Sequence, residues 1–177
     1  MKMNTPLGLL TFRNDRIGAS SNGDEDRLVA ELAELGRNPN DRSAADLAAR
    51  IMSRTTSARL RNAAVLALVD LDARSKVSDI VNLLRQPGID CSAGTPLFAL
   101  GELGGRLPLD VAVKLIAKGS FEARAETLTF MEEGRIDDTS EASAADAHAS
   151  LTRIAAGSDL EAAEAATLAL AYLSDTL

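Results

Sequence analysis

An internal repeat constrains the fold of this chain more than any other feature of its sequence. Residues 61–71 and 93–103 carry apolar side chains at the same positions after a shift of 32 residues. Two further copies follow at 124–133 and 166–173, after shifts of 30 and about 40 residues. Such repetition is typical of arrays in which each unit buries its apolar face against its neighbours. The sequence therefore predicts a stack of similar units.

A second apolar series alternates with the first. Ile51, Leu83 and Leu115 are 32 residues apart, and Ile154 follows after 39 more. Glycine, which commonly ends a helix, and Ser or Asp, which commonly begin one, lie between the two series. The pattern predicts one helix and then four helical hairpins, with the bounds 24–36, 43–54 with 57–71, 75–86 with 89–104, 108–119 with 121–134, and 143–157 with 159–174.

Composition favours helices over strands. The chain contains 31 Ala and 26 Leu but only seven Val and seven Ile, and Ala and Leu are the better helix formers. We expect an all-α domain over residues 24–177, with residues 1–23 as an irregular or loosely packed arm. Because the start of the chain is too charged for a signal peptide and Cys91 is the only cysteine, we expect a cytoplasmic protein without disulfides.

The layout resembles the HEAT-repeat (armadillo-type) superfamily over about residues 43–174. In that superfamily the second helix of a hairpin often opens with an apolar-Arg-x-x-Ala pattern. Leu60, Arg61 and the alanines after them match it, and Arg124 matches in part, whereas Ala93 and Ala163 replace the arginine in the other two hairpins. The resemblance implies a right-handed α-α superhelix of about four hairpins plus an N-terminal helix. The alternative is an irregular helical bundle in which the spacing arises by chance.

No residue pattern points to catalysis, a cofactor or a metal. His148 is the only histidine, and Asp146, two residues away on a helix, does not face it; we expect a surface or packing side chain. We expect Cys91 to be a buried or half-buried thiol. The glycines at 101, 104 and 105 end a predicted helix, so they indicate a stop signal and not a phosphate loop. Carboxylate pairs, such as 132–133, are expected on the solvated surface.

Negative charge is concentrated at the C-terminal end. Residues 120–177 contain twelve acidic and three basic residues, a net charge of −9, whereas the rest of the chain carries +2. This distribution argues against nucleic acid as a partner, because phosphate binders neutralise backbone charge with Lys and Arg. HEAT-like DNA glycosylases also carry aromatic side chains, which make up only 3% of this chain. No apolar run is long enough to span a membrane, so we expect no membrane partner.

The predicted helix 121–134 carries two parallel stripes of side chains. Phe121, Ala125 and Leu128 form an apolar stripe with helical spacing. A second stripe, shifted by one residue, contains three acidic residues that repel one another, so it is either a solvated face or a surface shaped for a basic partner. The HEAT resemblance would add Glu102 and Glu164 to the same concave side. The candidate partner-binding residues are Glu102, Glu122, Glu126, Thr129, Glu133 and Glu164.

Three functions remain open at this level. The first is a non-catalytic protein-binding module that captures a basic partner; acidic immunity proteins, which neutralise bacterial toxin domains, resemble this chain in size and charge. The second is a HEAT-like bilin lyase, which would need a groove for a large conjugated pigment. The third is an adaptor or structural subunit, including a homo-oligomer formed through the terminal helices, because the segment 160–173 is apolar nearly all round.

Overall fold

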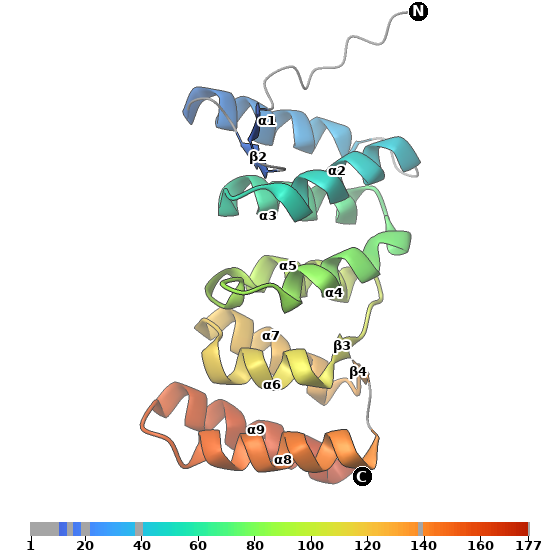
Figure 1. The fold of residues 1–177 in the computed structure, drawn as a ribbon. Helices are drawn as coiled ribbons and strands as arrows, with labels where there is room; N and C mark the ends of the chain where they lie inside the picture. The colour runs from blue at the N-terminus through green and yellow to red at the C-terminus, as the bar shows by residue number, and fades with distance from the viewer. Residues whose placement is uncertain (1–10, 14–15, 19–21, 38–40, 138–139, 177) are drawn as a thin grey trace, which may run out of the picture. The chain divides into compact units, whose positions relative to one another are not determined.

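The chain forms two compact units, residues 1–79 and 80–177. The computed structural model describes residues 11–13, 16–18, 22–37, 41–137 and 140–176, and helices make up most of this part of the chain (Figure 1). The boundary between the two units falls within the helix α4, Val77–Arg85.

Among its described residues, unit 1 contains the helices α1, α2 and α3, the 3-10 helix η1 and a short hairpin. The helix α3 packs against both α1 and α2. The strands β1 and β2 pair antiparallel, with Phe12 opposite Ile17. The elements are β1 (Thr11–Arg13), β2 (Arg16–Gly18), α1 (Asn22–Leu35), α2 (Arg42–Arg54), α3 (Ala58–Asp70) and the 3-10 helix η1 (Arg74–Lys76).

Unit 2 has two layers of helices. The second helices of the hairpins, α5, α7 and α9, contact one another in that order, whereas α6 contacts α8 and also packs against α7 and α9 (Figure 1). The strand β3 pairs in parallel with β4. The elements that follow α4 are η2 (Asp90–Ser92), α5 (Gly94–Glu102), β3 (Leu107–Pro108), α6 (Leu109–Lys118), α7 (Phe121–Glu132), β4 (Ile136–Asp137), α8 (Glu141–Ala155) and α9 (Leu160–Thr176).

The second helices begin and end in a recurring way. The hydroxyls of Ser57 and Ser120 accept the backbone N–H groups that lie three residues later, which caps the starts of α3 and α7. Each of the helices α3, α5 and α7 is followed by a loop of the same conformation, in which one residue has a positive φ and ends the helix. That residue is Asp72, Gly104 and Gly134 in turn, with φ of 47°, 72° and 64°.

The helix predictions are confirmed within about two residues at most ends, but α5 begins at Gly94, whereas the sequence pattern predicts a start at 89. Pro96 explains the shorter helix, because a proline lacks the N–H group that an earlier start would require within the helix. The short strands were not expected: β1 and β2 lie inside the segment predicted as an irregular arm, of which residues 1–10, 14–15 and 19–21 are outside the described residues. The single repeat domain over 24–177 stays a prediction.

Within the part of the chain that the structure describes, none of the helices is both long and apolar enough to cross a lipid bilayer.

Candidate interaction surface

The buried side of α7 is not its apolar stripe. Phe121 is 73% exposed, Ala125 is exposed and Leu128 is only half-buried. The buried residues of this helix are Ala123, Arg124, Thr127, Phe130 and Met131. Both stripes of the sequence analysis therefore lie on the outer side of the helix, and the apolar one faces away from the core of unit 2.

Arg124 holds α7 in this orientation. Its side chain is 10% exposed and donates to the backbone carbonyl of Ile116 at 3.1 Å. It also pairs with Asp159 at 3.0 Å and with Glu161 at 3.1 Å, both at the start of α9. A buried guanidinium is stable in the interior when its N–H groups have hydrogen-bond or ion-pair partners, as those of Arg124 do. Because it links α7 to α6 and α9, it fixes which side of α7 faces outward.

Arg135 binds the end of α7 to the end of α5. Its guanidinium donates to the carbonyls of Gly101 and Gly105 at 2.9 and 2.8 Å, and it lies 4.6 Å from the centre of the Phe130 ring. The same side chain pairs with Glu133 at 3.0 Å. Among the described residues, Glu133 therefore has an ion-pair partner, unlike Glu122 and Glu126 of its stripe.

All six candidate residues lie on the second helices of unit 2 or directly after them. Glu102 ends α5, Glu122, Glu126 and Thr129 lie on α7, and Glu164 lies on α9. Glu126 is half-buried and the others are exposed. The Thr129 hydroxyl donates to the carbonyl of Ala125 in its own helix at 3.2 Å, so it adds no charge and no cross-helix bond.

We call the exposed side of α5, α7 and α9 the acidic face. Glu132, predicted only as part of a carboxylate pair on the solvated surface, also belongs to it. Five of its glutamates have no ion-pair or hydrogen-bond partner within the described residues: Glu102, Glu122, Glu126, Glu132 and Glu164. The helices α5 and α9 contain no Lys or Arg, and the one arginine of α7 is buried. The face is therefore a patch of uncompensated negative charge.

The other layer of unit 2 is electrically balanced at its ends. Lys114 on α6 pairs with Asp90 at 2.8 Å and donates to the carbonyls of Leu84 and Gln86, just where α4 ends. Arg85 pairs with Asp110 across the same two helices at 3.2 Å. Basic side chains here are used to join neighbouring hairpins, whereas the second helices present acids without such partners.

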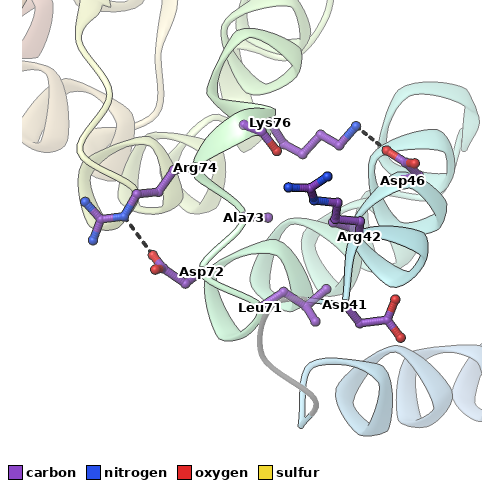
Figure 2. A pocket seen from close by; sticks show the side chains of 10 residues that line it. Asp41, Arg42, Asp46, Leu71, Asp72, Ala73, Arg74 and Lys76 are labelled. Atoms are coloured by element: carbon purple, nitrogen blue, oxygen red, sulfur yellow. Dashed lines mark hydrogen bonds and ion pairs between the residues drawn. The ribbon is translucent and has the colours of Figure 1, made fainter.

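A hollow of about 400 Å³ in unit 1 is lined by balanced charges (Figure 2). It lies between the start of α2 and the loop after α3. Lys76 donates to Asp46, and this bond raises the pKa of Lys76 and lowers that of Asp46. Arg74 pairs with Asp72 at 2.9 Å. Asp41 caps α2, and its pKa is lowered chiefly by the hydrogen bond that the Ser43 hydroxyl donates to it and then by the N–H of Ala44. Because charged side chains that line the hollow pair with one another, we interpret it as part of the junction between α2 and the loop after α3.

The remaining candidates are simple to place. His148 is exposed, as expected for a surface side chain. Cys91 is exposed too, so the expectation of a buried or half-buried thiol is wrong: it lies in η2, outside the packed helix α5. Gly104 ends α5 with a positive φ and is a stop signal. In the described ranges, no group of three or more His, Cys, Asp or Glu side chains is arranged to hold a metal ion.

Comparisons of this chain with protein-family models, with curated proteins and with solved structures find no match.

Proposed function

We propose that this chain is a non-catalytic protein-binding module whose acidic face binds a basic partner. The observation that carries the proposal is the set of five glutamates on α5, α7 and α9 that have no partner within the described residues. A patch of one sign with no internal counter-charge attracts a partner of the opposite sign, speeds its encounter and rejects partners of like charge.

The fold does not need these charges where they are. Glu122 and Glu126 are four residues apart on α7, so their repulsion destabilises the helix by about 0.3 kcal/mol. Neighbouring helices could relieve this with a lysine or arginine, as α4 and α6 do for Asp110 and Asp90. A basic partner would relieve it in the complex, which favours binding over the free state.

The finer architecture is also a proposal. A HEAT-like right-handed superhelix would continue the two layers of unit 2 through the whole chain. The recurrence of the same loop after α3, α5 and α7, at Asp72, Gly104 and Gly134, supports equivalent repeats in both units. Small-angle scattering tests this: the profile of an elongated superhelix is expected, and the profile of a globular bundle would contradict it.

Neutralisation of a basic toxin domain is one specific form of this function. It is supported by the acidic charge of −7 in a chain of 177 residues and by the position of the unpaired acids on one face. In that form the partner is a basic domain, and we expect co-expression with this chain to protect cells from that domain; no protection would contradict this form of the proposal.

A charge-reversal experiment tests the general proposal. The variant Glu122→Lys/Glu126→Lys/Glu164→Lys changes three unpaired acids and leaves Glu133 with its partner Arg135. A control, Glu34→Lys/Asp70→Lys/Asp146→Lys, makes the same change of net charge at exposed acids away from the face. Binding of a lysine-rich peptide is measured by fluorescence anisotropy at low and near-physiological salt, and circular dichroism checks the fold.

We expect the face variant to weaken binding at least about tenfold and the control to weaken it far less, with both differences smaller at higher salt. Equal losses in the two variants would show that net charge, and not the acidic face, drives binding. Unchanged binding in the face variant would refute the proposal.

A further inference from the structure

Large apolar side chains are exposed in the middle of the acidic face. Phe98 on α5 is 44% exposed and Leu168 on α9 is 50% exposed, and Leu128 on α7, between these two helices, is half-buried. A single exposed apolar side chain is ordinary in a protein, but a group of them on adjacent elements commonly marks a contact surface.

These three side chains lie at the same level of neighbouring helices. Phe98 and Leu128 each precede by six residues the positive-φ glycine that ends their helix, Gly104 or Gly134. The starts of α7 and α9 correspond as well, because Ser120 and Asp159 accept the backbone N–H three residues later. Counted from these caps, Leu168 is level with Thr129, next to Leu128. We call Phe98, Leu128 and Leu168 the apolar band.

Unpaired acids lie along both edges of the apolar band. Glu102 and Glu132 each follow a band residue by four positions, and Glu164 precedes Leu168 by four. Four residues are slightly more than one helical turn, about 6 Å along the axis. Glu122 and Glu126 lie toward the start of α7, around the helix from Leu128. Glu122 lies against the start of α5, because a Cβ added at Gly94 would be 3.4 Å from the Glu122 Cβ. The band is thus an apolar strip across three helices with carboxylates above and below it.

We propose that the apolar band binds an amphipathic basic helix of the partner protein. The helix would lie across α5, α7 and α9, with its apolar stripe on the band and lysines or arginines on both flanks, where they meet the two rows of acids. This inference rests on the proposed function and specifies the element of the partner that is recognised.

The dimensions favour a helix. Packed helices lie about 8–10 Å apart, and residues seven apart on one side of a helix are about 10.5 Å apart along its axis. An apolar residue in every second turn would therefore meet the band side chains of successive helices. An anionic membrane surface would be repelled by the acids along both edges.

Two peptides of equal composition and charge test the inference on the full chain. One is a lysine–leucine peptide with all leucines on one helical side, and the other has the same residues in a scrambled order without an apolar side. The band variant is Phe98→Ser/Leu168→Ser. Leu66→Ser is the matched control, because Leu66 is a leucine of similar exposure, 43%, on the second helix α3 of unit 1.

We expect the amphipathic peptide to bind the native chain at least about tenfold more tightly than the scrambled one. The band variant is expected to lose this difference while it keeps its affinity for the scrambled peptide, and the Leu66 variant is expected to keep both. If the double variant loses its helical circular dichroism signal, the single variant Leu168→Ser gives the same test with a smaller expected change in affinity.

Equal binding of the two peptides by the native chain would overturn the inference and leave the proposed function intact. Failure of both peptides to bind would overturn the proposed function as well. The inference would also be overturned if the native chain sediments as a dimer and the band variant as a monomer, because a second copy of the chain would then cover the band.

Discussion

The helices α3 and α7 have the same frame but different outer sides. Each begins after a serine cap, carries an arginine one position after its first buried residue, and ends in the same loop with a residue of positive φ. The outer side of α3 carries two charged residues, Arg59 near its start and Asp70 at its end. Arg59 pairs with Asp26 of α1. On α7 the outer side holds Glu122, Glu126 and Glu132.

This difference separates what the fold requires from what it allows. The caps, the buried positions and the final loop recur, so they are the conditions for a stable second helix. Within the described residues, the outer side of α7 carries three unpaired glutamates, whereas the unpaired acid of α3, Asp70, is the last residue of that helix. The fold alone therefore does not explain the glutamates of α7. Matched substitutions in the two helices test this difference.

The largest effect is expected for the arginine of α7, in comparison with the equivalent arginine of α3. Arg124→Ala removes the donor to the carbonyl of Ile116 and leaves Asp159 and Glu161 without their partner. Because the two carboxylates are mostly exposed, most of the cost comes from the buried carbonyl, and the free energy of unfolding is expected to fall by about 2 kcal/mol. Arg61→Ala, at a half-buried side chain, should cost about 1 kcal/mol. Urea unfolding measures both, and equal losses would contradict the special role of Arg124.

Next come the serine caps. Ser120→Ala removes the acceptor for the N–H of Ala123 and should lower the free energy of unfolding by about 1 kcal/mol. Ser57→Ala should cost more, because the Ser57 hydroxyl also donates to Glu25 of α1. Thermal unfolding by circular dichroism compares the two variants. A larger loss at Ser120 would mean that the bond to Glu25 adds nothing to stability.

The residues with positive φ should give effects of opposite sign. Gly134→Ala places a side chain in the left-handed region, with no atom within 4 Å of the added Cβ, so only backbone strain counts, and we expect a loss of about 0.7 kcal/mol. Asp72→Gly relieves the same strain, apart from the loss of the exposed Arg74 pair, and should be neutral or slightly stabilising. A clear loss at Asp72 would contradict the equivalence of the two loops.

The smallest effect is expected in the acid range. Asp159 caps α9, and its pKa is lowered, chiefly by the N–H of Ala162 and then by Arg124. A carboxyl with a lowered folded-state pKa contributes stability above its unfolded pKa, and this contribution is lost as the pH falls through the folded value. Asp159→Ser keeps a cap without charge. The free energy of unfolding of this variant should therefore fall less steeply below about pH 4 than that of the native chain. An unchanged slope between pH 5 and pH 2, measured by urea unfolding, would rule out this contribution.

Much of the helical pattern could be predicted from the sequence, because local signals determine it. The glycines at 104 and 119 and the serine at 120 mark real helix ends, and the period of about 32 residues places the buried positions of α3 and α5. Pro96 could have predicted the late start of α5. The strands β1 and β2 are only three residues long and carry charged residues, so they give no alternating signal.

The orientation of α7 could not be predicted, because it depends on distant residues. Its buried side includes Arg124, which is stable there only through Asp159 and Glu161, 35 and 37 residues away. The apolar stripe of Phe121, Ala125 and Leu128 therefore does not mark the buried side of the helix. For the same reason the sequence grouped Glu133 with Glu122 and Glu126, although Glu133 pairs with Arg135. The sequence also did not identify Phe98 or Leu168 as surface residues.

The most direct test of the central claim is a nuclear magnetic resonance titration of the labelled chain with the lysine–leucine peptide. If the acidic face is the binding surface, the backbone amide signals of α5, α7 and α9 will shift, with large changes near Glu122, Glu126 and Glu164, and the signals of α3 will stay in place. The largest shifts in α3, or in α6 and α8, would contradict the account.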